Sequence, residues 1–376
     1  KSGYEFYAEL KFSTKEEAER FARSLKAIGV DARIAGSEKD GYTVRLDSDA
    51  FFGLLAATDA TPPGLAPLYS SKEGDFRVYA AVEGGRTRFY FAVKHEGVWR
   101  AVEGLYAERW VQLWRAEREV LEALRGAVTR ALKQLGHSAD VEEPKEDRDE
   151  KGNVKVYHLR LYGPHLRPFL EHAAKAMKTQ PAEVRLEGRR IVISTGDVKA
   201  EVEFKLLKGS EAIFLMAQDV GQTLALYKSL KALGVSVEIT PRGVKVDGEA
   251  MWALVATAVE RSAPSELPAE VMPGVELLKV YSAGGLRMYA FRVSEEGAHY
   301  YFAVKTGEGW RAAGGKKSGR QVMIAGEVAS VIADAINALY REMGVERRVE
   351  VKYNKRYDVP YIKLTNEDLR QLNLKE

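Results

Sequence analysis

Segments of this chain repeat one another in order. Residues 90–104 read YFAVKHEGVWRAVEG and residues 301–315 read YFAVKTGEGWRAAGG, with nine identical positions. Two further pairs are SLKAIGV with SLKALGV, and HLRLYGPHLRPFL with YIKLTNEDLRQLN, and the three spacings are 211, 205 and 203 residues. Such a period is too long for a solenoid repeat. It predicts two related domains, residues 1–179 and 180–376, in a monomer with an internal pseudo-two-fold axis.

Each copy reads as a mixture of helices and strands. In the first copy, Ser13 or Thr14 caps a helix that Gly29 ends. Two short strands follow, then a short apolar helix, AFFGLLAATD, capped at Ser48 or Asp49, and then the alternating strands FRVYAAVE and TRFYFAVK. The second copy repeats this order behind an extra hairpin. The pattern predicts an α+β fold, with an αββ unit ahead of an αββαββα core in each copy.

The longest helix is predicted from about residue 107 to residue 135. An apolar stripe at helical spacing runs along it, formed by Trp110, Leu113, Trp114, Leu121, Leu124, Val128 and Leu132. The second copy predicts the corresponding helix from about residue 325 to residue 343. In each copy we expect a strand hairpin and a short final helix after the long one.

From the short apolar helix onward, this order resembles the core of LAGLIDADG homing endonucleases, in which two such units form a saddle of strands on DNA. FFGLLAATD has Gly53, Leu54 and Ala57 where the signature has Gly, Leu and Ala, and MWALVATAV occupies the same place in the second copy. In the family, each signature helix ends in an Asp that binds a divalent metal for hydrolysis. Those positions fall here on Thr58 and Ala258. The resemblance therefore implies a relative of this fold without the nuclease chemistry.

A second resemblance is carried by longer strings. VDGEAMWALVA, AVKTGEGWRAAGG, AINALYREMGVERRVEVKY and VPYIKLTNEDLRQL are similar to the recurring C-terminal block of the PaRep repeat family, subgroup two-b, of hyperthermophilic crenarchaea. The similarity covers nearly all of the second copy and, more weakly, the first. It implies an archaeal, hyperthermophilic lineage, and it implies no mechanism.

Composition narrows the classes of site and partner. The chain has no cysteine, which excludes disulfides and thiolate metal sites. No apolar run reaches the roughly 20 residues of a membrane span, and no signal-peptide pattern is present. We therefore expect a cytoplasmic protein with no membrane partner. Residues 1–150 hold 23 Lys and Arg against 27 Asp and Glu, whereas residues 151–376 hold 34 against 27.

The repeated strands suggest a nucleic-acid surface. On a strand, Tyr90, Ala92 and Lys94 share one face, and tyrosine with lysine suits contact with bases and phosphates. We therefore predict a non-catalytic protein that binds DNA or RNA, with no cofactor and no metal. The predicted phosphate contacts are Arg88, Lys94, Arg100, Arg189, Arg190, Arg287, Lys305 and Arg311.

Two alternatives belong to other classes. A metal-dependent endonuclease would use Asp59 and Glu260, which follow the two signature positions. A protein-interaction scaffold would bind a partner helix through the Trp-bearing stripe and would have no affinity for nucleic acid. The seven-residue spacing of His158, His165 and His172 does not predict a metal site, because no other ligand class accompanies the histidines at fixed spacing.

Overall fold

A computed structural model describes residues 8–37, 39–115, 117–138, 140–294, 298–356 and 358–374. The fold is α+β, as predicted, and its sheets are antiparallel. The chain divides into two compact units. Unit 1 runs to Met177 and includes the short segments Gln218–Leu224 and Ile239–Gly243, and unit 2 holds the rest. Within the described ranges, every helix is too short or too polar to cross a membrane.

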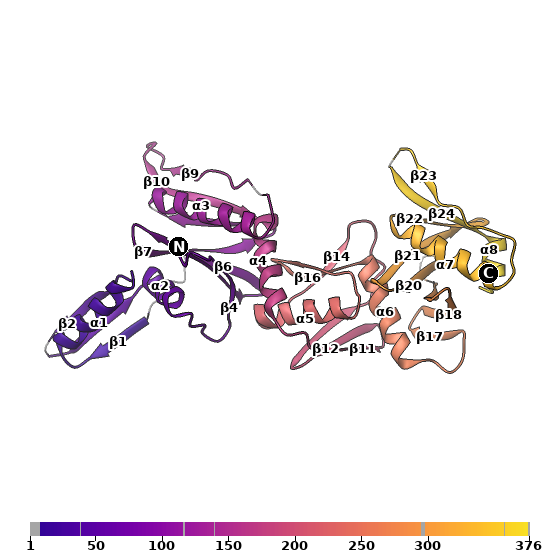
Figure 1. Ribbon diagram of the computed structural model, residues 1–376, viewed down its shortest axis with the longest axis horizontal. Coiled ribbons are helices and arrows are strands. Elements are labelled where there is room, and N and C mark those ends of the chain that lie inside the picture. Colours follow the sequence, from indigo (N-terminus) through magenta and orange to yellow (C-terminus); the bar gives the residue numbers. More distant parts are fainter. Residues whose placement is uncertain are drawn as a thin grey trace. The chain divides into compact units, whose positions relative to one another are not determined.

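Unit 1 begins with a small βαββ module and continues into a wide sheet (Figure 1). Its elements are β1 (Ala8–Phe12), α1 (Lys15–Ala27), β2 (Arg33–Ser37), β3 (Gly41–Leu46), α2 (Ser48–Thr58), β4 (Leu65–Ser70), β5 (Phe76–Glu83), β6 (Arg86–His95), β7 (Val98–Ala107), β8 (Trp110–Arg115), α3 (Arg118–Gln134), β9 (Lys145–Arg148), β10 (Val154–Tyr162) and α4 (Gly163–Ala176). The small sheet has the order β1-β3-β2, and the wide sheet has the order β4-β5-β6-β7-β8-β10-β9.

Helices cover both faces of the middle of the wide sheet. On one face, Phe52 of α2 stacks on Tyr90 of β6 at 4.5 Å between ring centroids, within one core that also includes α1. On the other face, Phe91 stacks on Phe76, which contacts Phe169 of α4. The helix α3 lies across β10 and also contacts β6 and β8 (Figure 1).

The later part of the chain repeats this order of elements. After Met177 come β11 (Ala182–Glu187), β12 (Arg190–Thr195), β13 (Val198–Glu203), β14 (Ala212–Leu215), α5 (Val220–Ala232), β15 (Glu238–Thr240), β16 (Gly243–Asp247), α6 (Gly248–Ser262), β17 (Ala269–Met272), β18 (Val275–Ala283), β19 (Leu286–Val293), β20 (His299–Thr306), β21 (Gly309–Ser318), β22 (Gln321–Ala325), α7 (Val328–Glu342), β23 (Lys352–Asn354), β24 (Val359–Thr365) and α8 (Asn366–Gln371). The sheet order β17-β18-β19-β20-β21-β22-β24-β23 matches that of unit 1 with one extra strand. The sheets β11-β12-β13 and β14-β16-β15 precede it.

The repeated heptapeptide ends a helix and ties it to the sheet. In SLKAIGV, the amide of Val30 bonds to the carbonyl of Leu25, while Gly29 adopts a φ of 83°, so α1 ends in a Schellman motif. The carbonyl of Gly29 then accepts a hydrogen bond from the amide of Trp99 at 2.8 Å. In SLKALGV, the carbonyl of Gly234 accepts the same bond from Trp310, also at 2.8 Å. The two occurrences of the heptapeptide thus form the same hydrogen-bonded connection between the end of a helix and a strand.

The prediction of one long helix from residue 107 to residue 135 was wrong at its start. Residues 110–115 form β8, and α3 begins only at Arg118. In β8, Val111 and Leu113 are fully buried, while Trp110 and Trp114 lie on the opposite side of the strand. The spacing of Trp110, Leu113 and Trp114 also fits a helix, so this short apolar run satisfied both periodicities.

Candidate nucleic-acid interface

In unit 1, two of the predicted phosphate contacts are engaged by carboxylates. Arg88 is 13% exposed and pairs with Glu83 and Glu103. Arg100 lies 3.6 Å from a carboxylate oxygen of Asp49. Lys94 is exposed, and in the described ranges it has no carboxylate partner. A phosphate would have to displace the acidic partners of both arginines.

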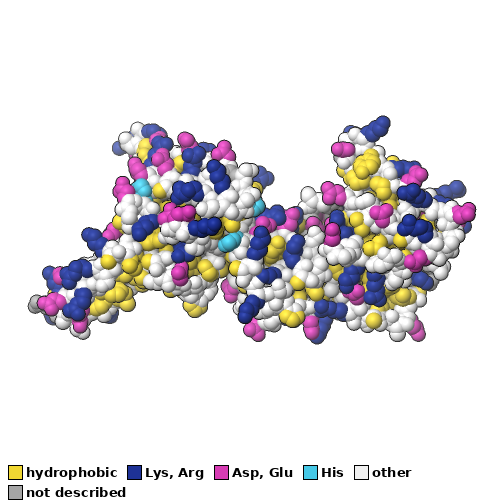
Figure 2. Space-filling view, viewed as in Figure 1, with side chains coloured by type: hydrophobic (Ala, Val, Ile, Leu, Met, Phe, Trp, Pro, Cys, Tyr) yellow, Lys and Arg dark blue, Asp and Glu magenta, His cyan; other side chains and the backbone are white. Residues whose placement is uncertain are grey.

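The same holds for unit 2. Arg287 and Lys305 share Glu260, with N–O distances of 3.4 and 2.6 Å. Arg311 pairs with Glu249 at 2.6 Å, and Arg190 pairs with Glu201 at 2.8 Å. The guanidinium of Arg189 lies 6.0 Å from the ring of Phe204. The visible surface intermixes cationic and acidic side chains throughout (Figure 2).

The face predicted to present tyrosine and lysine is covered at its tyrosine end. Tyr90 is 2% exposed beneath Phe52, and Ala92 is fully buried in the same core. The prediction assumed that one side of β6 faces solvent. It was wrong because α2 packs on that side, so both faces of β6 belong to cores.

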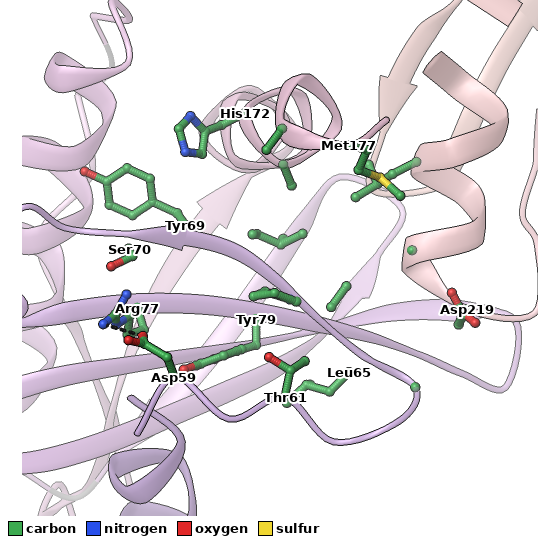
Figure 3. Close-up of a pocket in the computed structure, with 18 residues that line it drawn as sticks. Asp59, Thr61, Leu65, Tyr69, Ser70, Arg77, Tyr79, His172, Met177 and Asp219 are labelled. Atoms are coloured by element: carbon green, nitrogen blue, oxygen red, sulfur yellow. Dashed lines mark ion pairs between the residues drawn. The ribbon is translucent and has the colours of Figure 1, made fainter. Parts of the chain in front are cut away.

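The two acids of the endonuclease alternative are also held in ion pairs. Asp59 ends α2 in the left-handed conformation and binds Arg77 at 2.8 Å, beside a pocket lined by β4, β5 and α4 (Figure 3). Glu260 holds Arg287 and Lys305. His172 lines the same pocket as Asp59, and the centroid of its ring lies 5.6 Å from that of Tyr69. Over the described ranges, no three His, Asp or Glu side chains form a cluster of metal-ligand type.

A different surface of unit 1 combines aromatic rings with a cation. It is the side of β8 and β10 that faces away from α3, and we call it the open face. Its side chains are Trp110, Gln112 and Trp114 from β8, and His158, Arg160 and Tyr162 from β10. All six are at least partly exposed, whereas their strand neighbours Val111, Leu113, Leu159 and Leu161 are fully buried.

The open face consists of three cross-strand pairs. Trp110 lies opposite Tyr162, Gln112 opposite Arg160, and Trp114 opposite His158. The rings of Trp110 and Tyr162 are 6.0 Å apart, and those of Trp114 and His158 are 5.0 Å apart. The guanidinium of Arg160 lies 5.3 Å from the centre of the Trp110 ring, within range of a cation–π interaction. A ring pair therefore stands at each end, with a cation between them.

The face is open because α2 covers the sheet only as far as β7. The helix α2 contacts β6 and β7, and its first turn carries Asp49. Asp49 accepts hydrogen bonds from the amide of Ala101 at 2.7 Å and from both terminal nitrogens of Arg115, at 2.7 and 2.6 Å. Arg115 also donates to the carbonyl of Ala101. This ion pair gives hydrogen-bond partners to both backbone groups of Ala101 in β7. It lies where the part of the sheet covered by α2 ends, so β8 and β10 are outside the covered part.

Two polar groups of the open face lack a protein partner. Both ring nitrogens of His158, and Nε of Arg160, are buried and make no hydrogen bond to the described residues. Burial lowers the pKa of His158, and the charge of Arg160 lowers it further. His158 is therefore neutral at pH 7, with one nitrogen able to donate a hydrogen bond and the other able to accept one.

Unit 2 has the same surface with different side chains. Its members are Gln321, Met323 and Ala325 of β22, opposite Thr365, Lys363 and Tyr361 of β24. Val322, Ile324, Ile362 and Leu364 point inward and are fully buried. The counterpart face thus keeps one cation, Lys363, whose Nζ lies 5.9 Å from the Tyr361 ring, and carries one aromatic ring instead of four.

Sequence reasoning missed the open face because it placed Trp110 and Trp114 on a helix. The turn before β8 is Glu108–Arg109. Glu108 has a φ of 52°, a backbone conformation that residues other than glycine rarely adopt. Unit 2 has Gly319 at the corresponding place, at a φ of 58°. Aligning the copies at the 211-residue spacing pairs Glu108 with Gly319 and would have revealed the turn.

Comparison of the chain with protein-family models, with curated proteins and with solved structures gives no match.

Proposed function

We propose that this chain binds nucleic acid without cleaving it and that the open face of unit 1 is the contact surface. The observation that carries the proposal is the pairing of Trp110 with Tyr162 and of Trp114 with His158 around Arg160. Aromatic rings stack on bases of any sequence, and an arginine contacts phosphate or stacks on a base. An uncovered sheet face with this composition suits such a ligand.

The proposal moves the binding surface away from the cations chosen from the sequence. Arg88, Arg287 and Lys305 serve to hold carboxylates in the folded units. Arg160 differs, because its guanidinium lies over an indole and makes no ion pair with the described residues. Asp59 and Glu260 are engaged by cations, which favours binding over metal-dependent hydrolysis.

We also propose that the two halves arose by duplication, related to the PaRep block and more distantly to LAGLIDADG proteins. The matching strand orders and the paired Gly29–Trp99 and Gly234–Trp310 bonds support the duplication. Nucleic-acid binding by a sheet surface agrees with the second kinship. It does not depend on that kinship.

Fluorescence anisotropy of labelled DNA and RNA oligonucleotides, titrated with the whole chain over a salt series, tests the function. We expect saturable binding that weakens with salt, because phosphate contacts release counterions. Arg160→Ala should bind about fivefold more weakly. The substitution removes a guanidinium that would contact a phosphate or stack on a base, and such a contact contributes about 1 kcal/mol.

Lys363→Ala is the matched control, because it removes the cation at the same position of the counterpart face. We expect it to change affinity less than about twofold, as for a solvated surface charge. Absence of binding at low salt would overturn the proposed function. Equal affinities of the wild type and Arg160→Ala would remove the open face as its site.

A further inference from the structure

We infer that the open face selects single-stranded nucleic acid and holds two unstacked bases, one on each ring pair. This inference rests on the proposed function and specifies its ligand. Base pairs in a duplex cover each other's faces and offer only their edges in the grooves. The ring pairs can be used fully only by bases whose faces are free.

The spacing of the ring pairs sets the length of strand that the face holds. Trp110 and Trp114 lie four residues apart on β8, so their Cα atoms are about 13 Å apart. Stacked neighbours in a duplex rise only about 3.4 Å. Bases on both ring pairs must therefore be separated by an extended backbone, and we expect about four nucleotides to fill the face.

The polar groups between the ring pairs fit a splayed strand. Arg160 and Gln112 lie opposite each other at the middle of the face, where the backbone joining the two bases would pass. His158 lies beside Trp114 at one end of the face, and its ring completes that ring pair. The open face thus offers stacking at its ends and polar contacts along its length.

Few cations lie on the open face. Arg160 is its only cationic side chain, and Lys145 of β9, next to His158 across the strands, is paired with Glu142 at 2.7 Å. A duplex presents many phosphates and is bound chiefly through several cations. Affinity for a single strand should depend on stacking, and the slope of log K against log salt should be only about −1.

The test compares labelled oligothymidylates of two to twelve nucleotides, an oligouridylate and a duplex, each titrated with the whole chain by anisotropy. We expect the affinity to rise up to about four nucleotides, and the single strand to bind at least about tenfold more tightly than the duplex. Trp114→Ala should weaken binding of the single strand about tenfold and leave the duplex unaffected. Trp114→Phe should retain most of the affinity, because it keeps a ring.

Met323→Ala is the matched control, since Met323 is exposed (52%, against 46% for Trp114) on the counterpart face. It should bind within about twofold of the wild type, and circular dichroism should show that all variants are folded. Equal binding of single strand and duplex, with Trp114→Ala like the wild type, would overturn this inference and leave nucleic-acid binding standing. Absence of binding to any probe would overturn both.

Discussion

The two halves of the molecule share an architecture and differ in what they present to solvent. On the inward sides, equivalent positions do equivalent work: Phe52 stacks on Tyr90 at 4.5 Å, and Trp252 stacks on Tyr301 at 4.3 Å. On the outward sides of β8–β10 and β22–β24, four aromatic rings in one half correspond to one in the other. Packing constrains the inward positions, whereas the outward ones differ between the two units within the same fold. A function carried by the outward side chains therefore belongs to one half.

The largest expected difference concerns the ion pair at the margin of the open face. Asp49 is 16% exposed, binds the Ala101 amide and both terminal nitrogens of Arg115, and lies near Arg100. Its counterpart Glu249 binds Arg311 at 2.6 Å. We expect Asp49→Ala to lower the free energy of unfolding by about 3 kcal/mol, because it removes the acceptor of the Ala101 amide and leaves the largely buried Arg115 with only the exposed Glu117 as an acidic partner. Glu249→Ala should cost about 1 kcal/mol.

Urea unfolding followed by circular dichroism measures both changes. The ratio of the two losses is more informative than either loss alone, because it compares how strongly each half depends on this ion pair. Equal losses for Asp49→Ala and Glu249→Ala would show that the margin of the open face is not specially reinforced.

A smaller effect is expected from rebuilding the missing ring pair in unit 2. Ala325 is exposed and lies opposite Tyr361, as Trp114 lies opposite His158. In the Trp114→Ala background, Ala325→Trp should recover about threefold in affinity for a single strand, since one new stacking contact forms. Anisotropy measures the gain, and Ala325→Leu controls for added apolar area. A leucine that restored as much affinity as tryptophan would argue against stacking.

The smallest expected effect is a difference in acid sensitivity between two helix starts. His165 Nδ1 accepts a hydrogen bond from the Tyr162 amide at 3.2 Å at the start of α4, and Asp368 does the same for Thr365 at the start of α8, at 2.7 Å. Burial lowers the pKa of His165, although Glu142 and Asp140 oppose it. Burial would raise the pKa of Asp368, but hydrogen bonds from Arg347 and Thr365 bring it below its usual value.

The two depressed pKa values place the losses in different pH windows. Stability from neutral His165 is complete above its unfolded pKa of about 6.5 and falls as the pH drops below it, whereas Asp368 loses its contribution only below about pH 4. Between pH 7.5 and 5.5, urea unfolding should show a loss of about 0.5 kcal/mol that His165→Asp reduces. An unchanged loss in His165→Asp would assign the sensitivity to other groups.

Much of the fold could be predicted from the sequence because local sequence signals and tertiary structure agree. The helix cap at Thr14, the helix end at Gly29 and the strands β5 and β6 all lie where the sequence pattern predicted them. The cap of α2 was displaced by one residue, because Asp47, rather than Ser48 or Asp49, accepts the bond from the Ala50 amide. Asp49 therefore does not cap the helix, and its carboxylate binds the sheet instead.

The open face could not be predicted from the sequence for two physical reasons. The turn at Glu108 carries no glycine, asparagine or aspartate to mark it. Whether a Tyr–Lys face such as that of β6 is solvated depends on whether a distant helix covers it, and strand periodicity does not contain that information. Several of the cations chosen from the sequence have acidic partners far away in the chain, as Arg311 has in Glu249.

The most direct test of the central claim uses the five tryptophan indoles. Trp99, Trp252 and Trp310 are at most 3% exposed, whereas Trp110 and Trp114 stand on the open face. In a nitrogen-15 indole spectrum titrated with a short oligothymidylate, we expect the signals of Trp110 and Trp114 to shift together and the other three to stay in place. Shifts confined to Trp252 or Trp310, or no shift at saturating oligonucleotide, would contradict binding at the open face.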